Sequence, residues 1–250
     1  MHRPEHKRFV RQVQTALHLL YPPRCVGCGE LVEADFGLCG ACWKDTPLIG
    51  GLVCNFCGVP LPGDGQVSET SCDDCMAVTR PWQQGRAALL YQGTARKLVL
   101  RLKHADRHDI ARPAISWMQR AAQGLNLQDV IVVPIPLHWR RFLRRRYNQS
   151  ALLAQSLAQA MGLEYCPDFL VRSKPTPALE AATREERFAL LRGAIVPNPR
   201  HHKLAQGRSV LLVDDVITSG ATFSAATHAC LQSQASEVRV IALARVAMHT

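Results

Sequence analysis

The sequence predicts an α/β protein in which a mostly parallel sheet with flanking helices follows a small cysteine-rich domain. From Trp82 onward, apolar runs typical of strands alternate with helical patterns, which favours a parallel sheet covered on both faces. Eight of the ten cysteines precede residue 76, which marks a separate N-terminal domain. In addition, an apolar run at 210–213 leads into two adjacent aspartates, which a buried strand normally excludes.

Length and composition allow more than one folded part. At 250 residues with 47% hydrophobic content, the chain can bury a sizeable core. We expect an amphipathic helix at 1–22, a double zinc-ribbon domain at 23–80 and an α/β domain at 82–250.

The N-terminal segment is basic, and its apolar residues recur at helical spacing among polar ones. This pattern predicts a helix that packs against its own domain, in preference to one that contacts a membrane. The segment lacks the continuous apolar centre of a secretory signal. The sequence contains no stretch of about 18 apolar residues, which a transmembrane helix would need. We therefore expect a cytoplasmic protein.

Four Cys-x-x-Cys units occupy residues 25–75. Each unit can direct two thiolates to one tetrahedral ion, and the 10, 11 and 14 residues between consecutive units are close to the spacing of zinc ribbons. We expect about two structural zinc ions, one for every four cysteines. The spacing leaves sequential and interleaved pairing of the units both open. The predicted ligands are Cys25, Cys28, Cys39, Cys42, Cys54, Cys57, Cys72 and Cys75.

Two other uses of paired cysteines fit less well. A disulfide framework belongs to secreted proteins, and a redox Cys-x-x-Cys normally occurs once, near a strand–helix junction. Lys44 is the only basic residue between Cys25 and Cys75, which argues against direct DNA contact by this segment.

The α/β domain contains eight predicted elements. The β-branched run at 130–133 is typical of a strand buried on both faces. Cys166 and Cys230 are predicted core residues, because free cysteine is commonly buried. The predicted strands span 86–91, 130–133, 210–213 and 238–244, and the predicted helices span 94–102, 110–122, 150–161 and 222–232.

The run at 210–213 continues into Asp214, Asp215 and a loop of small residues. In parallel sheets, ligands bind beyond the carboxyl ends of the strands, and buried carboxylates need hydroxyl donors or a metal. The loop precedes a predicted helix, whose N-terminus presents free N–H groups to an anion. A sugar 5-phosphate with a free cis-diol satisfies both the carboxylates and the loop.

The segment Val-Leu-Leu-Val-Asp-Asp-Val-Ile-Thr-Ser-Gly-Ala-Thr at 210–222 resembles the phosphoribosyl pyrophosphate (PRPP) signature of type I phosphoribosyltransferases. The resemblance implies a type I phosphoribosyltransferase-like sheet, with Asp214 and Asp215 on the ribose hydroxyls. An ordinary capped helix would need no paired carboxylates. The loop residues that the resemblance places around the 5-phosphate are Thr218, Ser219, Gly220, Ala221 and Thr222.

Further motifs extend along the chain. They are Leu-Leu-Tyr-Pro-Pro-x-Cys at 19–25, the four cysteine pairs, Tyr-Gln-Gly-Thr at 91–94, Leu-Lys-His-Ala at 102–105, Pro-Ile-Pro-Leu at 134–137 and Arg-Arg-Arg-Tyr-Asn-Gln-Ser at 144–150. Together they resemble the ComF/GntX family, in which a double zinc ribbon precedes a phosphoribosyltransferase domain. The resemblance implies a role in natural competence, DNA uptake or use of DNA as a nutrient.

A basic segment follows the strand predicted at 130–133, with five arginines and no acidic residue from Val130 to Leu163. Guanidinium groups suit phosphate, so the segment can bind the diphosphate of PRPP or a nucleic-acid backbone, with neighbouring aromatic rings to stack bases. A solvated basic face is the plain alternative. We place Arg140 and Arg141 near the diphosphate. The remaining candidates are Arg144, Arg145 and Arg146, which extend outward, and Lys103, which can close over the site.

Three functions remain open at this point. The predicted one is a PRPP-binding accessory protein for DNA uptake or processing, with PRPP, single-stranded DNA or DNA-processing proteins as partners; the net charge of +10 supports a polyanion partner. The second is an active phosphoribosyltransferase that uses Mg²⁺ with PRPP and an unidentified acceptor. The third is a zinc-dependent nucleic-acid-binding module with a vestigial PRPP pocket. No residue stands out as a general base, and the oligomeric state has no signature in the sequence.

Overall fold

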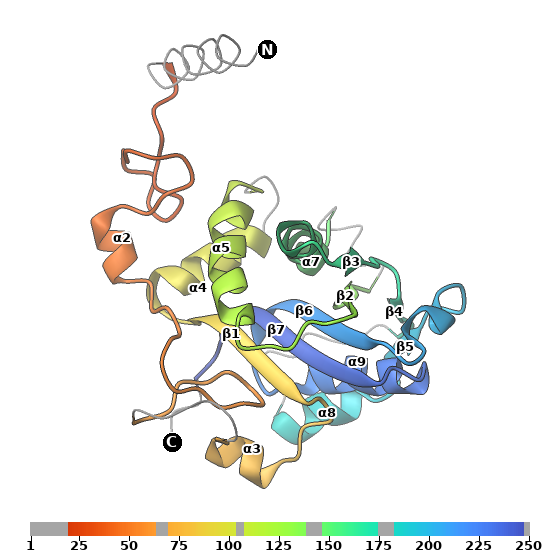
Figure 1. Cartoon of the computed structure of the whole chain (residues 1–250). Coiled ribbons are helices and arrows are strands. Elements are labelled where there is room, and N and C mark those ends of the chain that lie inside the picture. The colour runs from red at the N-terminus through yellow and green to blue at the C-terminus, as the bar shows by residue number, and fades with distance from the viewer. Residues whose placement is uncertain (1–19, 64–69, 104–107, 139–146, 175–182, 248–250) are drawn as a thin grey trace, which may run out of the picture.

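A computed structural model of the chain describes residues 20–63, 70–103, 108–138, 147–174 and 183–247. Five strands form one sheet in the order β1-β7-β6-β2-β3, and all neighbouring pairs are parallel (Figure 1). A separate antiparallel pair joins β4 (Leu170–Arg172) and β5 (Ile195–Pro197). The five sheet strands are β1 (Gln84–Leu90), β2 (Val130–Pro134), β3 (Glu164–Tyr165), β6 (Ser209–Ile217) and β7 (Glu237–Arg245).

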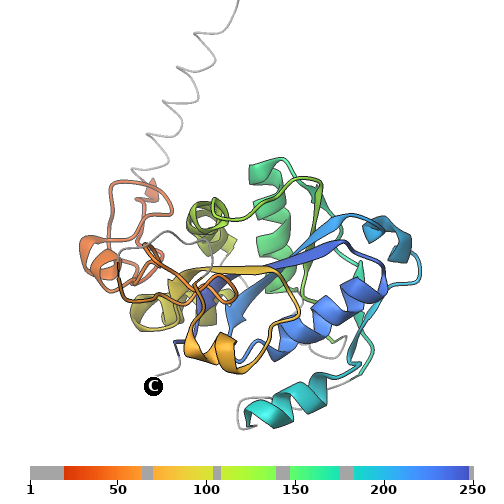
Figure 2. The same cartoon turned by 60° about the horizontal axis from the view of Figure 1, so that its bottom comes forward.

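Helices cover both faces of this sheet (Figures 1 and 2). One face carries α4 (Gly93–Lys103), α5 (Ala111–Ala122) and α7 (Gln149–Met161), and the other carries α9 (Ala221–Gln232), with α8 (Arg184–Leu191) packed against α9. None of the helices in the described ranges is both long and apolar enough to cross a membrane. Two 3-10 turns, His108–Ile110 and His202–Ala205, complete these elements.

The mostly parallel sheet with flanking helices confirms the predicted fold class. All eight predicted elements are present, although β6 is longer than expected and includes both aspartates. The strands β3, β4 and β5 and the helix α8 were not predicted. The predicted N-terminal helix falls mainly on residues 1–19, which lie outside the described ranges.

Alternating side chains of β6 build two cores. Leu211 and Val213 pack into the cluster formed with α4, α5 and α7, whereas Val210 and Leu212 pack into the cluster formed with α9. Cys166 and Cys230 are both buried in the second cluster, which confirms that they are core residues. Because both faces are buried, the carboxyl end of β6 is held rigidly where the aspartates begin.

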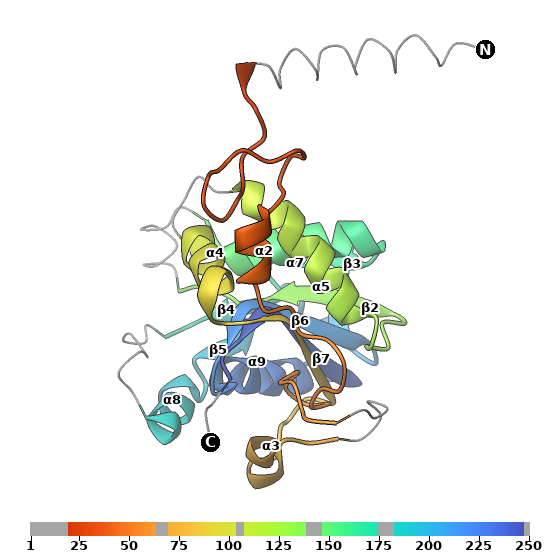
Figure 3. The same ribbon diagram turned by 90° about the vertical axis from the view of Figure 1, so that its left-hand side faces the viewer.

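The cysteine-rich segment carries two short helices, α2 (Gly40–Lys44) and α3 (Asp73–Ala77). The segment lies beside β1: Ile49 N–H donates to the Ala88 carbonyl at 2.9 Å, and Leu90 N–H donates to the Pro47 carbonyl at 2.9 Å. Figure 3 shows α2 on the side of α4 and α5, and α3 on the side of α9. The two halves of the segment therefore flank the sheet on opposite sides.

Candidate functional site

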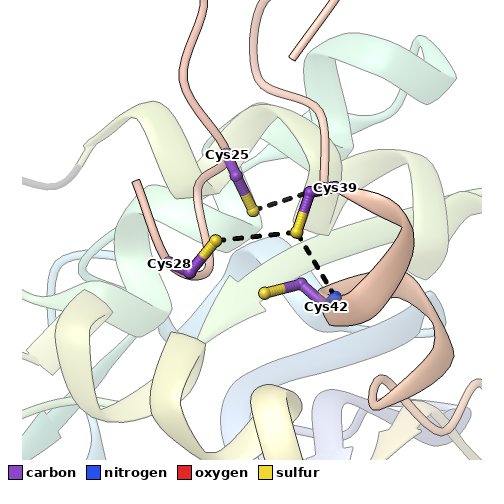
Figure 4. A group of neighbouring side chains, drawn as sticks. All are labelled: Cys25, Cys28, Cys39 and Cys42. Carbon is purple, nitrogen blue, oxygen red and sulfur yellow. Dashed lines mark hydrogen bonds between the residues drawn. The ribbon is translucent and has the colours of Figure 1, made fainter. Parts of the chain in front are cut away.

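The eight N-terminal cysteines gather into two tetrads. Within each tetrad the four sulfur atoms lie within 4.8 Å of one another, and in the first tetrad they point toward a common centre (Figure 4). The first two Cys-x-x-Cys units make one tetrad and the last two make the other, so the pairing is sequential. The first tetrad is Cys25, Cys28, Cys39 and Cys42, and the second is Cys54, Cys57, Cys72 and Cys75.

In each tetrad one cysteine has a lowered pKa, whereas the pKa values of Cys28, Cys42, Cys72 and Cys75 are raised by burial and by the neighbouring sulfur atoms. At Cys25, burial raises the pKa, but backbone N–H donors, that of Cys39 at 3.2 Å among them, outweigh it and lower the pKa to about 6. The pKa of Cys54 lies far below its usual range because the thiols of Cys57 and Cys75 donate hydrogen bonds to it. Thiolates are the form that binds metal. An all-sulfur donor set of four fits structural zinc, and such ions would hold each ribbon together.

The two aspartates are tied to the helix α7 and to α4. Ser150 Oγ donates to Asp214 Oδ1 at 2.6 Å, and Gln149 Nε2 donates to Asp215 Oδ2 at 3.3 Å. Lys103 Nζ, at the end of α4, lies 3.4 Å from Asp215 Oδ2. Gln149 is buried, and its Oε1 atom has no hydrogen-bond partner among the described residues. This oxygen can accept a hydrogen bond from a donor such as a hydroxyl group or a water molecule.

Asp214 is the more strongly perturbed carboxyl group. Burial raises its pKa to about 7, and the negative charge of Asp215 acts in the same direction. The hydrogen bond from Ser150 and the charge of Lys103 oppose this shift without cancelling it. The two neighbouring carboxylates therefore repel each other in a partly desolvated site, which disfavours ionisation of Asp214.

This shift predicts a pH-dependent stability. The pKa of Asp214 is higher in the folded protein than in the unfolded chain, so its ionisation disfavours folding, and stability falls as pH rises from about 4 to about 7. Between pH 6 and pH 8.5 the loss is on the order of 1 kcal/mol. We expect Asp214→Asn to gain melting temperature relative to the wild type as pH rises over this range. Thermal unfolding of both proteins in parallel measures the difference; a constant difference would contradict the assignment.

The loop after β6 leads into the N-terminus of α9. Gly220 is the N-cap with φ +84° and offers no side-chain cap, and Thr218 is exposed while Ser219 is buried. The first N–H groups of a helix have no intrahelical acceptor, and the N-cap residue Gly220 has no side chain to accept from them. Ser219 Oγ accepts from Ala221 N–H at 3.4 Å. The loop thus combines hydroxyl groups with a helix terminus that attracts anions.

Two buried arginines from other parts of the chain donate hydrogen bonds to backbone carbonyls of the loop. Arg80 Nη1 donates to the Ser219 carbonyl at 2.8 Å, and Arg245, at the end of β7, donates through Nη1 to the Thr218 carbonyl. Both side chains are less than a tenth exposed. Neither arginine was identified from the sequence, where Arg80 precedes a strand and Arg245 follows an apolar run without any motif.

The structure brings together some of the predicted residues. Asp214, Asp215 and Lys103 form one group at the carboxyl end of β6, and the loop 218–222 follows directly. Sequence reasoning missed Gln149 and Ser150 as partners of the aspartates, although both belong to the Arg-Arg-Arg-Tyr-Asn-Gln-Ser motif. The five arginines proposed for diphosphate or nucleic acid, Arg140, Arg141, Arg144, Arg145 and Arg146, lie outside the described residues.

Comparisons with known proteins agree with this architecture. Residues 16–76 match the Double zinc ribbon domain family. The chain is 31% identical over 236 residues to the DNA utilization protein YhgH of Escherichia coli K12, covering 91% of this chain and 99% of that protein. It is 28% identical over 229 residues to Competence protein F of Haemophilus influenzae, covering 89% of this chain and 96% of that protein.

The adenine phosphoribosyltransferase of Thermoanaerobacter pseudethanolicus aligns with a TM-score of 0.35 and 18% identity over 57% of this chain and 70% of that one. The relative from Escherichia coli aligns with this chain over almost its whole length. The chain therefore belongs to the ComF family, with a double zinc ribbon in its N-terminal part.

Proposed function

We propose that the protein binds PRPP together with Mg²⁺ and acts as a PRPP-dependent accessory protein in DNA uptake or the use of DNA. The observation that carries this proposal is the aspartate pair at the end of β6, held by Ser150 and Lys103 and followed by a helix N-terminus whose N-cap residue is a glycine. A hydroxyl-binding group and an anion-binding group in series match the two ends of a ribose 5-phosphate.

Each group has a separate task in this proposal. Asp214 and Asp215 accept hydrogen bonds from the ribose hydroxyls, and Gln149 Oε1, which has no partner within the described ranges, offers a third acceptor nearby. The loop 218–222 donates its N–H and hydroxyl groups to the 5-phosphate. Lys103 balances the charge of Asp215 and is placed to approach the ligand. Mg²⁺ supplies charge neutralisation to the diphosphate of the ligand when bound.

The role in DNA use extends what the relatives' names state. They are called a DNA utilization protein and a competence protein, and the present chain carries a net charge of +10. Positive charge of this size favours association with nucleic acid. We propose that the basic segment around Arg144 contacts single-stranded DNA and that PRPP occupancy reports the nucleotide status of the cell.

Calorimetric titration of PRPP with Mg²⁺ tests the binding step. We expect the wild type to bind, and we expect Asp214→Asn/Asp215→Asn to lose at least 100-fold in affinity, because two charge-assisted hydrogen-bond acceptors are weakened at about 1.5 kcal/mol or more each.

Asp129→Asn is the matched control, since this exposed carboxylate pairs with Arg208 at 2.9 Å, away from the loop. It should bind PRPP as the wild type does. Equal binding by the double variant, or no binding by the wild type, would refute the proposal. Release of diphosphate on addition of one acceptor would instead establish a transferase.

A further inference from the structure

A single guanidinium group touches both the second cysteine tetrad and the loop after β6. Arg80 Nε donates to Cys75 Sγ at 3.3 Å, and Arg80 Nη1 donates to the Ser219 carbonyl at 2.8 Å. The side chain is only 7% exposed. The two partners are remote in sequence, because Ser219 is 139 residues beyond Arg80. A metal-site ligand and the loop are thus one side chain apart.

The surroundings fix Arg80 in this position. Its guanidinium lies 5.6 Å from the ring centre of Trp82. Trp82 in turn donates through Nε1 to the Phe56 carbonyl of the second ribbon at 2.6 Å and packs edge-on against Phe223 of α9 at 6.2 Å. A planar guanidinium between a tryptophan and two hydrogen-bond acceptors has little freedom to choose another geometry.

Gly220 lies directly against this pair. A Cβ atom at Gly220 would be 2.9 Å from Arg80 Nη1 and 3.1 Å from Trp82 Cη2. The N-cap of α9 therefore contacts the arginine that contacts the tetrad. Since the peptide unit is planar, holding the Ser219 carbonyl also sets the direction of the Gly220 N–H, which is one of the groups at the helix terminus.

The contact between Arg80 and Cys75 depends on whether the tetrad binds metal. Four thiolates around one Zn²⁺ carry a net charge of about −2, and donors to the sulfur atoms stabilise the ligands and orient them. Arg80 would satisfy this need when the metal is bound. Without the metal, protonated thiols attract a guanidinium far less, because the negative charge is lost.

We propose that Arg80 is a positioning residue that couples zinc binding at the second tetrad to the conformation of the loop 218–222. The second ribbon would then influence PRPP binding by this loop. The identity of the loop's ligand as PRPP rests on the proposed function, whereas the coupling between the tetrad and the loop does not. Because coupling between two sites is reciprocal, zinc at this tetrad should tighten PRPP binding, and PRPP with Mg²⁺ should slow the release of zinc.

Two other arginines provide matched controls. Arg86 is also buried and also joins the second ribbon to the sheet, donating to the Asn55 carbonyl at 3.0 Å, but within the described part of the chain its hydrogen bonds do not reach the loop. Arg245 donates to the loop at the Thr218 carbonyl, and among the described residues it has no hydrogen bond to a tetrad sulfur. Arg80 is the one residue of the three whose described contacts include both partners.

Hydrogen–deuterium exchange of the loop amides and zinc transfer to a colorimetric chelator test the coupling on the full-length protein. For Arg80→Met we expect about tenfold faster exchange at 216–222 and about tenfold faster loss of one of the zinc ions, as suits the loss of charge-assisted hydrogen bonds. Arg80→Lys should show the same two increases in rate, but smaller ones. Arg86→Met should leave loop exchange unchanged. Arg245→Met should speed loop exchange without speeding zinc loss.

The Cys72→Ser variant removes a ligand of the second tetrad without altering Arg80 and guards against misfolding of the arginine variants. It should also speed exchange at 216–222. Unchanged loop exchange in both Arg80→Met and Cys72→Ser would overturn the coupling. In a wild type that binds PRPP, zinc release insensitive to PRPP with Mg²⁺ would overturn it as well. If the wild type binds no PRPP, the proposed function fails, while the exchange and zinc-release results still decide the coupling.

Discussion

Removal of zinc is expected to unfold the cysteine-rich segment while leaving the parallel sheet folded. The apolar cluster at the second tetrad is small: three of its cysteines are buried with a few partly buried side chains around them. A structural zinc site contributes about 10 kcal/mol or more to folding, which exceeds what such a cluster can supply alone. The two clusters on the faces of the sheet contain none of the tetrad cysteines.

Metal analysis and limited proteolysis measure this outcome. Purified protein should hold about two zinc ions, one for each tetrad, and Cys28→Ser and Cys72→Ser should each lose one of them. After chelation, proteases should cut within 23–80 before they cut the sheet. Cys230→Ser serves as the control, because Cys230 is a buried residue of α9 and belongs to neither tetrad. Zinc-free protein with an intact, resistant N-terminal segment would exclude the ribbon assignment.

A second large effect is expected from Gly85→Ala at the junction of the ribbon and the sheet. A Cβ atom at this position would lie 2.2 Å from the Phe56 carbonyl oxygen and 2.9 Å from its carbon. Gly85 N–H also donates to the Asn55 carbonyl at 2.8 Å, so the two backbones cannot separate without breaking this bond. The cost is about 3 kcal/mol, at the upper end for overpacking, which corresponds to a fall in melting temperature of roughly 10 °C.

Thermal unfolding followed by proteolysis checks this expectation. The second ribbon should become the first site of cleavage, since its contact with β1 is the one that the methyl group disrupts. Gly50→Ala is the matched control, because no atom lies within 4 Å of a Cβ at that position. If Gly85→Ala melts within 2 °C of Gly50→Ala, a shift that corresponds to less than about 1 kcal/mol, the ribbon does not pack against β1 as described.

Local patterns in the sequence account for the parts of the fold that were predicted. The β-branched run of β2 and the helical spacing of α4 and α9 depend only on near neighbours, and the Cys-x-x-Cys units state their chemistry within four residues. Short elements such as β3 and β4 carry too few residues for a period to emerge. The sequence alone also leaves the order of pairing among the cysteines open, because that order depends on how the loops between units fold.

The contacts that complete the site are of a different kind. Asp214 and Asp215 could be predicted from their position at the end of an apolar run. The residues that hydrogen-bond or pair with them come from other elements, namely Ser150 and Gln149 from α7 and Lys103 from α4. Arg80 offers no pattern at all, since its meaning lies in Cys75 and Ser219 meeting in space. Such residues become visible only when the sheet order is known.

The docking of the ribbon on β1 has a consequence for solubility. β1 is the outermost strand on its side of the sheet, and its free backbone groups would otherwise offer a template on which a second chain could add a strand. The segment around Pro47 and Ile49, together with Asn55, occupies those groups at Leu90, Ala88 and Gly85. Loss of metal would uncover this edge, so zinc-depleted protein should form aggregates through strand addition even while its sheet remains folded.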